Sequence, residues 1–546
     1  MKKFSILFIV LLILPFVFLY FKSGYFYMTH DGLYHLERTF YYVDSIKEGN
    51  LIPSWSRYYN SGFGSPIFIF LFPIPYLITS LLYIIGFSLT TTVKLAFVFF
   101  LGIGIISLYL LLNKGFLLKQ TASLFGCLLF IFSPLTISQV FVRGSLRELA
   151  GMAVFSFVLL ATVQLSKTIS KRKIGILALV SSIYFLTDGL TVILFALILG
   201  SFLLYFLIKS KNRLKLLLSY LLAYSLGIMT SSYMLLPFLK ESKYLKLNVG
   251  YFYRDHFIYP QQYFDPHWGF GFSMPGPIDG MSFQIGIINI LVIAIFILLV
   301  IKKRIKLDLF FILLIINLVV IFSLVTYSPL SLYIWEKVTP LRNIQLAWRL
   351  LTPVVLILAL IGAYVANYFK ISKKAVIAIY LFTLLVSFKY LRTNQIVVYE
   401  QRNLIKNSND ATAFHEFIPI YRERLTFAES QNKVEFTTNE VTISNFSEKN
   451  NSISFSTNSE KDSILRVNTL YFPGWEASVD GIKTGIIITE SQTRKNPNNH
   501  DLSGLIEIQI PQGNHDVNLQ FKDTQVRKQG KVLSILGFII SIILII

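Results

Sequence analysis

The chain has 546 residues, of which 54% are hydrophobic and 14% charged, and with a mean hydropathy of +0.61 this composition excludes a soluble globular protein. A formal net charge of +21 would suit nucleic-acid binding, but the basic residues lie in short clusters between apolar runs, such as "KSKNRLK" at 209–215. That arrangement is typical of the cytoplasmic loops of membrane proteins, so it excludes nucleic acid and makes membrane lipid the expected partner.

The first apolar run, residues 4–21, follows two lysines and is not followed by a small-residue cleavage site. This pattern predicts an uncleaved signal anchor with its N-terminus in the cytoplasm. The stretch "THDGLYHLERTFYYVDSIKEGNLIPSW", which begins at Thr29, is therefore expected outside the membrane. The protein is expected in a bacterial-type cytoplasmic membrane.

Apolar residues in this outer stretch recur every three or four positions over 33–46, which predicts an amphipathic helix along the membrane surface that ends at Gly49. Asp31, His35 and Arg38 share another face of that helix. A carboxylate, an imidazole and a guanidinium together suit a site that binds a phosphate and removes a proton. The alternative is that Asp31 caps the helix while His35 and Arg38 face lipid headgroups.

Seven crossings are expected before a large outer loop at 237–282. Their predicted positions are 4–21, 92–112, 120–139, 149–166, 174–187, 189–208 and 216–236. The proline-rich segment 66–89 is also apolar enough to cross, but a full crossing would move every later basic cluster to the outside. We therefore expect it to dip into the membrane or to lie against the bundle.

Ionisable residues lie near the membrane in the second outer loop, "FVRGSLRELAG", which contains Arg143, Arg147 and Glu148. Such residues are costly there unless they are solvated, paired or used, so they are candidates for a substrate site or for a simple Arg–Glu pair. Asp188 lies between two unusually short apolar runs. It fits either a cavity that reaches into the bilayer or a helix cap.

The large outer loop is aromatic and polar, and Trp268 suits stacking on a sugar, with packing of the loop as the alternative. Arg342 and Arg349 suit a clamp on a lipid phosphate or anchors at the interface. The histidine and aspartate spacing matches no strong metal motif, so a divalent metal stays open and no other cofactor is predicted. The weak ligand candidates are His30, Asp255, His256 and His267.

Four more spans are expected within 283–391, after which the composition becomes polar. Residues 392–528 show period-two apolar patterns and Pro-Gly and Asp-Gly turn signals, which predict an extracytoplasmic β-sandwich-like domain. A last apolar run, 531–546, returns to the membrane; it is short and ends abruptly, which leaves open whether the chain continues. The predicted fold is an α-helical polytopic membrane protein with about 12–13 transmembrane helices and a C-terminal β domain.

This layout resembles the GT-C superfamily of membrane glycosyltransferases, in which a seven-helix module carries an acidic residue in its first outer loop. Here the module corresponds to 1–236 and that loop to 22–91. Four stretches resemble, more narrowly, bacterial YfhO-type proteins with a "6-pyruvoyl-tetrahydropterin synthase-related" membrane domain. They are "HDGLYHLERTFYYVDSIKEGNLIPSWSRYYNSGFGSPIFIF", "VRGSLRELAG", "PLRNIQLAWRLLTP" and "LYFPGWEASVDGIKTG". Nothing resembles a soluble pterin synthase, which needs a histidine-rich zinc site.

The resemblance implies a polyprenyl-phosphate-linked sugar donor, used on the outer face, and an envelope polymer or glycan as acceptor recognised by the β domain. It implies that Asp31 acts as the base or orients the acceptor, with Glu148 as a second carboxylate and Arg143 or Arg147 as phosphate partner. The family often has a carboxylate pair where this chain has Asp31 followed by Gly32, which leaves the metal requirement open.

Two other functions fit the same membrane architecture. A flippase or transporter of a lipid-linked precursor would have functional polar residues spread through the bundle, whereas here they concentrate on the expected outer side. A non-catalytic envelope scaffold would tolerate Asp31→Ala without effect. Both alternatives stay open from the sequence.

Overall fold

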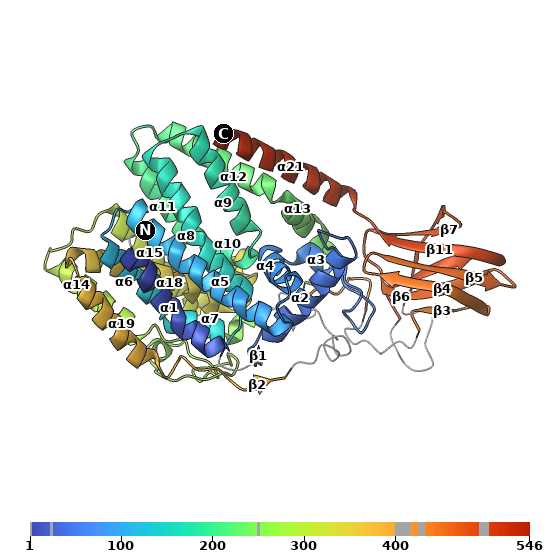
Figure 1. The fold of residues 1–546 in the computed structure, drawn as a ribbon, viewed down its shortest axis with the longest axis horizontal. Coiled ribbons are helices and arrows are strands. Elements are labelled where there is room, and N and C mark those ends of the chain that lie inside the picture. Colours follow the sequence, from blue (N-terminus) through green and yellow to red (C-terminus); the bar gives the residue numbers. More distant parts are fainter. Residues whose placement is uncertain (1–2, 22–25, 248–251, 399–415, 424–431, 491–501) are drawn as a thin grey trace.

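The computed structural model describes residues 3–21, 26–247, 252–398, 416–423, 432–490 and 502–546. A large helical part carries a β domain at one end, and the last helix returns from that domain along the helical part (Figure 1). The predicted fold class, a helical membrane part with a C-terminal β domain, is confirmed. Segments of the predicted loop 237–282 and of the predicted domain 392–528 lie outside the described residues; they are 248–251, 399–415, 424–431 and 491–501.

Five helical stretches among the described residues are long and apolar enough to cross a bilayer alone. They are α1 (Lys3–Phe21), Leu89–Gly115 with α5 (Leu89–Leu110), α8 (Leu146–Lys167), Ala347–Tyr368 with α18 (Thr352–Tyr368), and α21 (Gln525–Ile545). Two bent pairs raise the number to seven if each crosses as one unit. They are α6 (Gln120–Ile131) with α7 (Pro134–Phe141), bent by 51°, and α12 (Arg213–Thr230) with Ser232–Tyr244, which starts with α13 (Ser232–Glu241), bent by 76°.

The predicted 12–13 spanning helices exceed this number because several apolar runs fold into shorter helices. These are α9 (Lys171–Phe185), α11 (Ala196–Lys209), α14 (Ile287–Ile301), α15 (Leu309–Val325) and α19 (Lys373–Ser387), with 14 to 17 residues each. A helix of 15 residues is about 22 Å long, which is less than the ~30 Å hydrocarbon core of a bilayer. Hydropathy measures the length of an apolar run, but the helix within that run ends earlier, at a cap or a turn.

The proline-rich segment 66–89 is split, as its composition suggested. It contains α3 (Ile67–Phe70) and α4 (Ile74–Ile84), and α4 has 11 residues. Such a helix is about 16 Å long, too short to cross the bilayer. This agrees with the prediction that the segment does not make a full crossing as one helix.

The amphipathic helix is present as α2 (Gly32–Lys47), and Gly49, with φ +94°, ends it by donating its N–H to the Ile46 carbonyl at 2.9 Å. Protein covers both faces of α2, so its apolar side chains pack in the protein interior, and its position at the membrane surface stays a prediction. Leu36 belongs to the main core, and Tyr41 packs in a second cluster with residues of α3 and α4.

The β domain is a sandwich of two antiparallel sheets. Their orders are β3-β6-β10-β9 and β4-β5-β11-β7-β8. The strands are β3 (Val434–Phe436), β4 (Val441–Lys449), β5 (Ser452–Ser459), β6 (Ser463–Leu470), β7 (Trp475–Val479), β8 (Ile482–Thr484), β9 (Ile487–Ile488), β10 (Leu505–Ile510) and β11 (Gly513–Phe521). Alternate residues of β5 and β11 are buried between the sheets, as the period-two pattern predicts. A two-stranded ladder of β1 (Phe26–Tyr27) and β2 (Ile396–Val397) joins the first outer loop to the chain after α19.

The Asp-Gly signal forms the β7–β8 hairpin, with both Asp480 and Gly481 at positive φ. The imidazole of His515 lies 2.6 Å from the Asp480 carboxylate. Its hydrogen bond to that carboxylate raises the pKa of His515, and the same bond lowers the pKa of Asp480. The pair therefore makes the stability of the β domain depend on pH.

We predict that His515→Gln lowers the melting temperature most between about pH 4 and 6.5. The raised pKa of His515 contributes stability to the folded domain that is complete below the ordinary pKa of about 6.5. This stability is lost as the pH rises through the pKa of His515 in the folded domain. The lowered pKa of Asp480 contributes stability that is complete above its ordinary pKa of about 3.9. This stability is lost as the pH falls through the pKa of Asp480 in the folded domain. Melting curves of wild type, His515→Gln and the control His267→Gln over this range test the prediction. An equal His515→Gln effect at pH 9 would contradict it.

Two of the places that fix the β domain to the helical part involve buried side chains. Trp55 of the first outer loop packs against Trp475 and Phe521, with ring centroids 5.3 and 5.0 Å apart. The side-chain amide of Asn450, in the β4–β5 turn, donates to Asp44 at 3.0 Å and to Glu48 at 2.9 Å, so the C-terminal end of α2 is bonded to the sandwich.

The second place is the buried ion pair between Arg527 of α21 and Glu241 of α13, with Nε 2.9 Å from Oε2. Arg527 also donates to the Pro473 carbonyl of the β domain at 2.7 Å. Further along α21, a Cβ at Gly530 would lie 2.6 Å from the Ser232 carbonyl, and one at Gly537 would lie 2.7 Å from the Thr230 nitrogen. The two glycines thus allow α21 to pack closely against α12 and α13.

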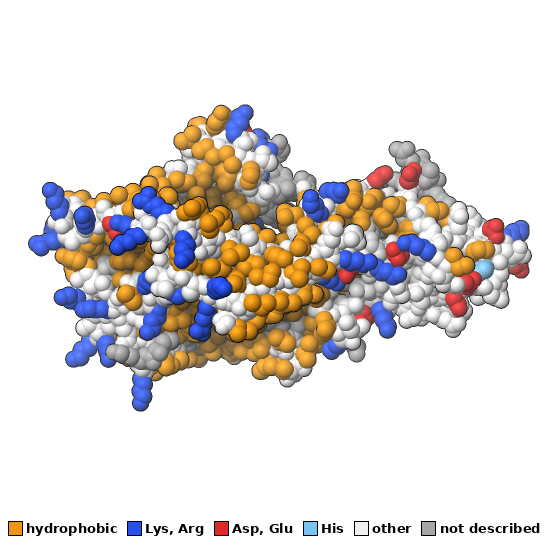
Figure 2. Space-filling view, turned by 90° about the horizontal axis from the view of Figure 1, so that it is seen from above, with side chains coloured by type: hydrophobic (Ala, Val, Ile, Leu, Met, Phe, Trp, Pro, Cys, Tyr) orange, Lys and Arg blue, Asp and Glu red, His pale blue; other side chains and the backbone are white. Residues whose placement is uncertain are grey.

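Hydrophobic side chains spread over the surface of the helical part, and few are visible on the β domain (Figure 2). Many Lys and Arg side chains gather at the end of the helical part farthest from the β domain (Figure 2). This distribution is that of a protein whose helical part sits in lipid.

Candidate active site

A cavity of about 490 Å³ lies beside the N-terminal end of α2, on the side of the helical part that carries the β domain. Its polar lining comes from distant parts of the chain: Asp31, Tyr34, His35, Arg38, Ser145, Arg147, Glu148, Asp188, Ser242, Asn343, Gln345, Arg349 and Glu416. One wall is apolar, with Phe70, Phe72, Leu190, Ile193, Phe238, Leu247 and Phe417. The predicted face of Asp31, His35 and Arg38 therefore points into one cavity.

Backbone pairing places Asp31 there. The N–H groups of His30 and Asp31 donate to the carbonyls of Val142 and Arg143 at 3.1 and 2.8 Å. Gly144 follows with φ +62°, and a Cβ on it would lie 2.2 Å from Oγ1 of Thr29. The first and second outer loops can approach this closely only because residue 144 is glycine.

We predict that Gly144→Ala lowers activity although no cavity side chain changes. The left-handed backbone costs a residue with a Cβ about 1–2 kcal/mol, and the clash with Thr29 adds to this. The loops would separate and displace Asp31. Melting temperature and envelope sugar content measure the effect, with Gly200→Ala as the control because nothing lies within 4 Å of its Cβ position. Full activity of Gly144→Ala would refute the assigned role of this pairing.

Asp31 precedes α2 but its carboxylate makes no cap hydrogen bond. No hydrogen bond or ion pair to this carboxylate is found among the described residues, and the residue is half-buried in the cavity. The capping alternative is therefore not what the structure shows. Asp31 is left with acceptor capacity for a substrate.

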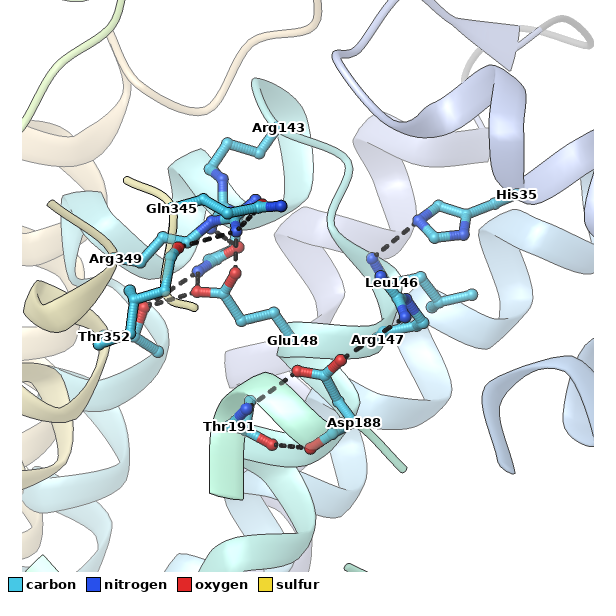
Figure 3. Close-up of polar contacts among 12 residues, drawn as sticks. His35, Arg143, Leu146, Arg147, Glu148, Asp188, Thr191, Gln345, Arg349 and Thr352 are labelled. Atoms are coloured by element: carbon cyan, nitrogen blue, oxygen red, sulfur yellow. Dashed lines mark hydrogen bonds and ion pairs between the residues drawn. The ribbon is translucent and has the colours of Figure 1, made fainter. Parts of the chain in front are cut away.

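Glu148, at the start of α8, is fully engaged with protein (Figure 3). Its carboxylate accepts from Arg143 Nη2, from Gln139 Nε2 and from Thr352 Oγ1, each at 2.7 Å. A carboxylate with three short bonds, one of them an ion pair, is poorly suited to take a proton from a substrate. Its geometry suits a positioning role that holds Arg143, which packs on the Trp348 ring and does not itself line the cavity.

Asp188 both caps a helix and lines the cavity, so the two alternatives for it coexist. Its Oδ2 accepts the N–H of Thr191 at 3.1 Å at the start of α10 (Gly189–Leu194), and its Oδ1 lies 3.9 Å from Arg147 Nη1 (Figure 3). The Arg147 side chain is 32% exposed and loosely held, so it is free to turn toward a ligand.

Arg349 enters the cavity from the other side. Its Nη1 donates to Gln345 Oε1 at 3.1 Å and to the Ile344 carbonyl at 3.2 Å, while its buried Nε has no hydrogen-bond partner among the described atoms. Gln345, at φ +66°, donates in turn to Glu416 at 2.6 Å. A guanidinium group that lines a cavity suits the binding of an anion.

His35 is a structural link between α2, α4 and α8. Its Nε2 accepts the N–H of Leu146 at 3.2 Å, so Nδ1 carries the proton and donates to the Tyr76 hydroxyl at 2.9 Å (Figure 3). Burial, then the guanidinium groups of Arg38 and Arg147, lower the pKa of His35 well below its ordinary value. Because both ring nitrogens are occupied by these bonds, His35 fixes the start of α8, where Arg147 lies.

Besides Arg143, two predicted substrate residues lie outside the cavity lining. Trp268 is 7% exposed and packs on Tyr390, so packing of the loop is the correct alternative. Arg342 donates to the carbonyls of Trp335 and Glu336. Both residues stabilise the outer loops.

The metal candidates are not brought together. His30 stacks on Phe272, and His256 bonds to Ser273 at 2.9 Å. Among the described residues, no group of three or more His, Cys, Asp or Glu side chains has the geometry to hold a metal ion.

The sequence matches one family model, "6-pyruvoyl-tetrahydropterin synthase related domain; membrane protein", over residues 68–393. No curated protein matches it. Among solved structures, the chain is similar to ArnT from Cupriavidus metallidurans bound to undecaprenyl phosphate, with 14% identity and a TM-score of 0.42 over 69% of this chain and 62% of that one. Another is the apo oligosaccharyltransferase of Archaeoglobus fulgidus, with 14% identity and a TM-score of 0.44 over 75% and 56%.

The chain spans about three fifths of the length of these two structures. The family model covers more than half of the chain and confirms the narrower resemblance seen in its motifs. The chain belongs to the family of membrane proteins with the 6-pyruvoyl-tetrahydropterin synthase related domain.

Proposed function

We propose that this chain is a membrane glycosyltransferase that moves a sugar from a polyprenyl-phosphate carrier to an envelope glycan or polymer. One observation carries the proposal: a single cavity combines a carboxylate that has no hydrogen bond or ion pair among the described residues, arginines that line the cavity, and several apolar residues. These three features suit an acceptor hydroxyl, a phosphate and an isoprenoid tail, respectively. The resemblance of the overall layout to GT-C membrane glycosyltransferases points the same way.

The chemistry requires one displacement. Asp31 takes the proton of an acceptor hydroxyl, whose oxygen attacks the anomeric carbon of the donor sugar. The bond from that carbon to the phosphate oxygen breaks, and its electron pair leaves with the polyprenyl phosphate. Arg349 and Arg147 stabilise the negative charge that develops on this leaving group. The attack inverts the configuration at the anomeric carbon.

The side of the membrane follows from charge. The cavity lies at the β-domain end of the helical part, whereas many basic side chains gather at the opposite end (Figure 2). By the positive-inside rule, the basic end faces the cytoplasm and the cavity faces outward. The concentration of polar lining at one end disfavours a transporter, which needs a path through the bundle.

The proposal is tested by the sugar composition of the envelope in a strain that lacks this chain. Deletion is expected to remove one specific sugar, and complementation with wild type is expected to restore it. An unchanged composition, with paralogues also deleted, would contradict the proposal. Accumulation of a lipid-linked precursor on the cytoplasmic side of the membrane would instead indicate a transporter.

Arg349→Gln is expected to lower sugar transfer about 10- to 100-fold, because a hydrogen bond to a charged group contributes about 1.5–3 kcal/mol. Arg349→Lys keeps the charge but loses the planar fork, so it is expected to recover only part of the activity. Transfer from a synthetic short-chain polyprenyl-phosphate sugar by the protein in nanodiscs measures both. Arg342→Gln, at an arginine outside the cavity, is the control. Equal activity of Arg349→Gln and the control would show that Arg349 does not contact the donor.

A further inference from the structure

A second hollow, a groove of about 600 Å³, lies in the β domain on the side where the first strands of the two sheets, β3 and β4, run (Figure 1). β3 is the edge strand of one sheet and β4 the edge strand of the other. The groove is therefore the open side of the sandwich, between the two sheet edges. None of its residues takes part in the cavity described above.

Aromatic rings line both sides of this groove. Phe436 on β3 is 50% exposed and Phe446 on β4 is 46% exposed, although both lie on strands of a folded sandwich. Exposed phenylalanines on opposite sides of a groove form two flat apolar faces. Faces of this kind suit a ring with an apolar side, such as a sugar.

A β-bulge places Phe446 in the groove. The β4–β5 register shifts between Ser444 and Ser447, and Asn445 in the bulge has φ +52°. In a regular strand, side chains alternate, so Phe446 would point away from Ile443. The extra residue turns Phe446 to the side of Ile443, and both line the groove. A bulge that re-aims one exposed aromatic ring indicates a binding position.

The rest of the lining consists of Val434 and Val441 and of three polar residues, two of which are held by ion pairs. Glu435 is paired with Arg466, and Lys433 lies 2.9 Å from Glu448. Lys433 also donates to the Gly62 carbonyl at 2.6 Å. The groove thus begins where the β domain meets the first outer loop, the loop that also carries α2 and Asp31. A chain bound here lies against the same loop as the catalytic cavity.

We propose that this groove binds a saccharide chain of the acceptor, with sugar rings against Phe436 and Phe446. The proposal rests on the glycosyltransferase function given above and adds to it the place where the acceptor is held. The polar lining supplies hydrogen bonds to hydroxyl groups, and the position beside the first outer loop holds the acceptor next to the enzyme between transfers.

The test is sedimentation of the full-length protein in nanodiscs with deproteinised envelope glycan from the deletion strain. Phe436→Ala and Phe446→Ala are each expected to weaken binding about tenfold, as for buried aromatic anchors at other interfaces. Phe446→Leu keeps an apolar side chain without a flat face and is expected to bind as weakly as Phe446→Ala. Ile482→Ala, at a residue of the same domain that is 74% exposed, is expected to bind within about twofold of wild type.

Wild-type-like binding by the phenylalanine variants, or no binding by wild type, would overturn the proposal. Displacement of the glycan by an extended peptide that pairs with the β4 edge would also overturn it. Asp31→Asn separates the two proposals, because it is expected to bind the glycan normally and to transfer no sugar. Glycan binding that depends on the phenylalanines, without any transfer by wild type, would refute only the glycosyltransferase.

Discussion

Asp31→Asn is expected to lower sugar transfer by about 10²- to 10⁴-fold, the contribution that a general base makes. The amide has nearly the same shape as the carboxylate but cannot accept the proton of the attacking hydroxyl. Because the Asp31 carboxylate has no hydrogen-bond partner among the described residues, its loss is expected to leave the fold and the melting temperature unchanged. Envelope sugar analysis of the deletion strain complemented with each variant, at expression matched by blotting, measures the effect.

Asp265→Asn is the matched control, since Asp265 lies in the large outer loop and does not line the cavity. It is expected to restore the sugar as wild type does. Full restoration by Asp31→Asn would remove Asp31 from the chemistry while leaving the pathway intact. A loss of folded protein in Asp31→Asn would contradict the structural reason given for its availability.

Removal of one partner of the Glu241–Arg527 pair is expected to destabilise the protein by about 3–5 kcal/mol, because the remaining charge is left buried and uncompensated. Arg527→Ala also loses the bond to Pro473 and the contacts with the Phe472 and Phe521 rings. The β domain is expected to separate from α13. Limited proteolysis and melting temperature of the protein in nanodiscs measure this.

The double variant Glu241→Leu/Arg527→Leu is expected to recover much of the loss, since no buried charge remains. The exposed pair of Lys483 and Glu476 is the control, and Lys483→Ala is expected to cost less than about 1 kcal/mol. Equal protease resistance of Arg527→Ala and Lys483→Ala would show that the buried pair does not hold the β domain.

The part of the site that could be predicted from the sequence lies on one helix. Asp31, His35 and Arg38 were placed together by helical spacing, and the structure brings all three to one cavity. Gln345 and Glu416 could not be predicted as a pair, because 71 residues separate them and only the tertiary fold makes their bond. The family resemblance implied a catalytic role for Glu148, whereas the structure shows the Arg–Glu pair that the sequence had left open, and its bonds to Gln139 and Thr352 are visible only in the folded protein.

The membrane part shows the same limit in another form. Hydropathy located the apolar runs correctly, but it gave no sign of the 51° bend between α6 and α7 or of the 76° bend after α12. The burial of α2 was also missed, because residues such as Tyr41 and Tyr42 suit both an interface and a core. The β strands were predicted well, since their alternation is a local property.

Some contacts of α2 can form only late in the synthesis of the chain. Asp44 and Glu48 emerge early from the ribosome, but Asn450, which bonds to both, is made about 400 residues later. Likewise, Gln345 can form its bond only after Glu416 has been made, and Glu241 can form its ion pair only after Arg527 has been made. A nascent chain with most of its helices already inserted therefore lacks both a wall of the cavity and the anchor of its catalytic helix. A chain truncated before residue 416 lacks all three of these contacts.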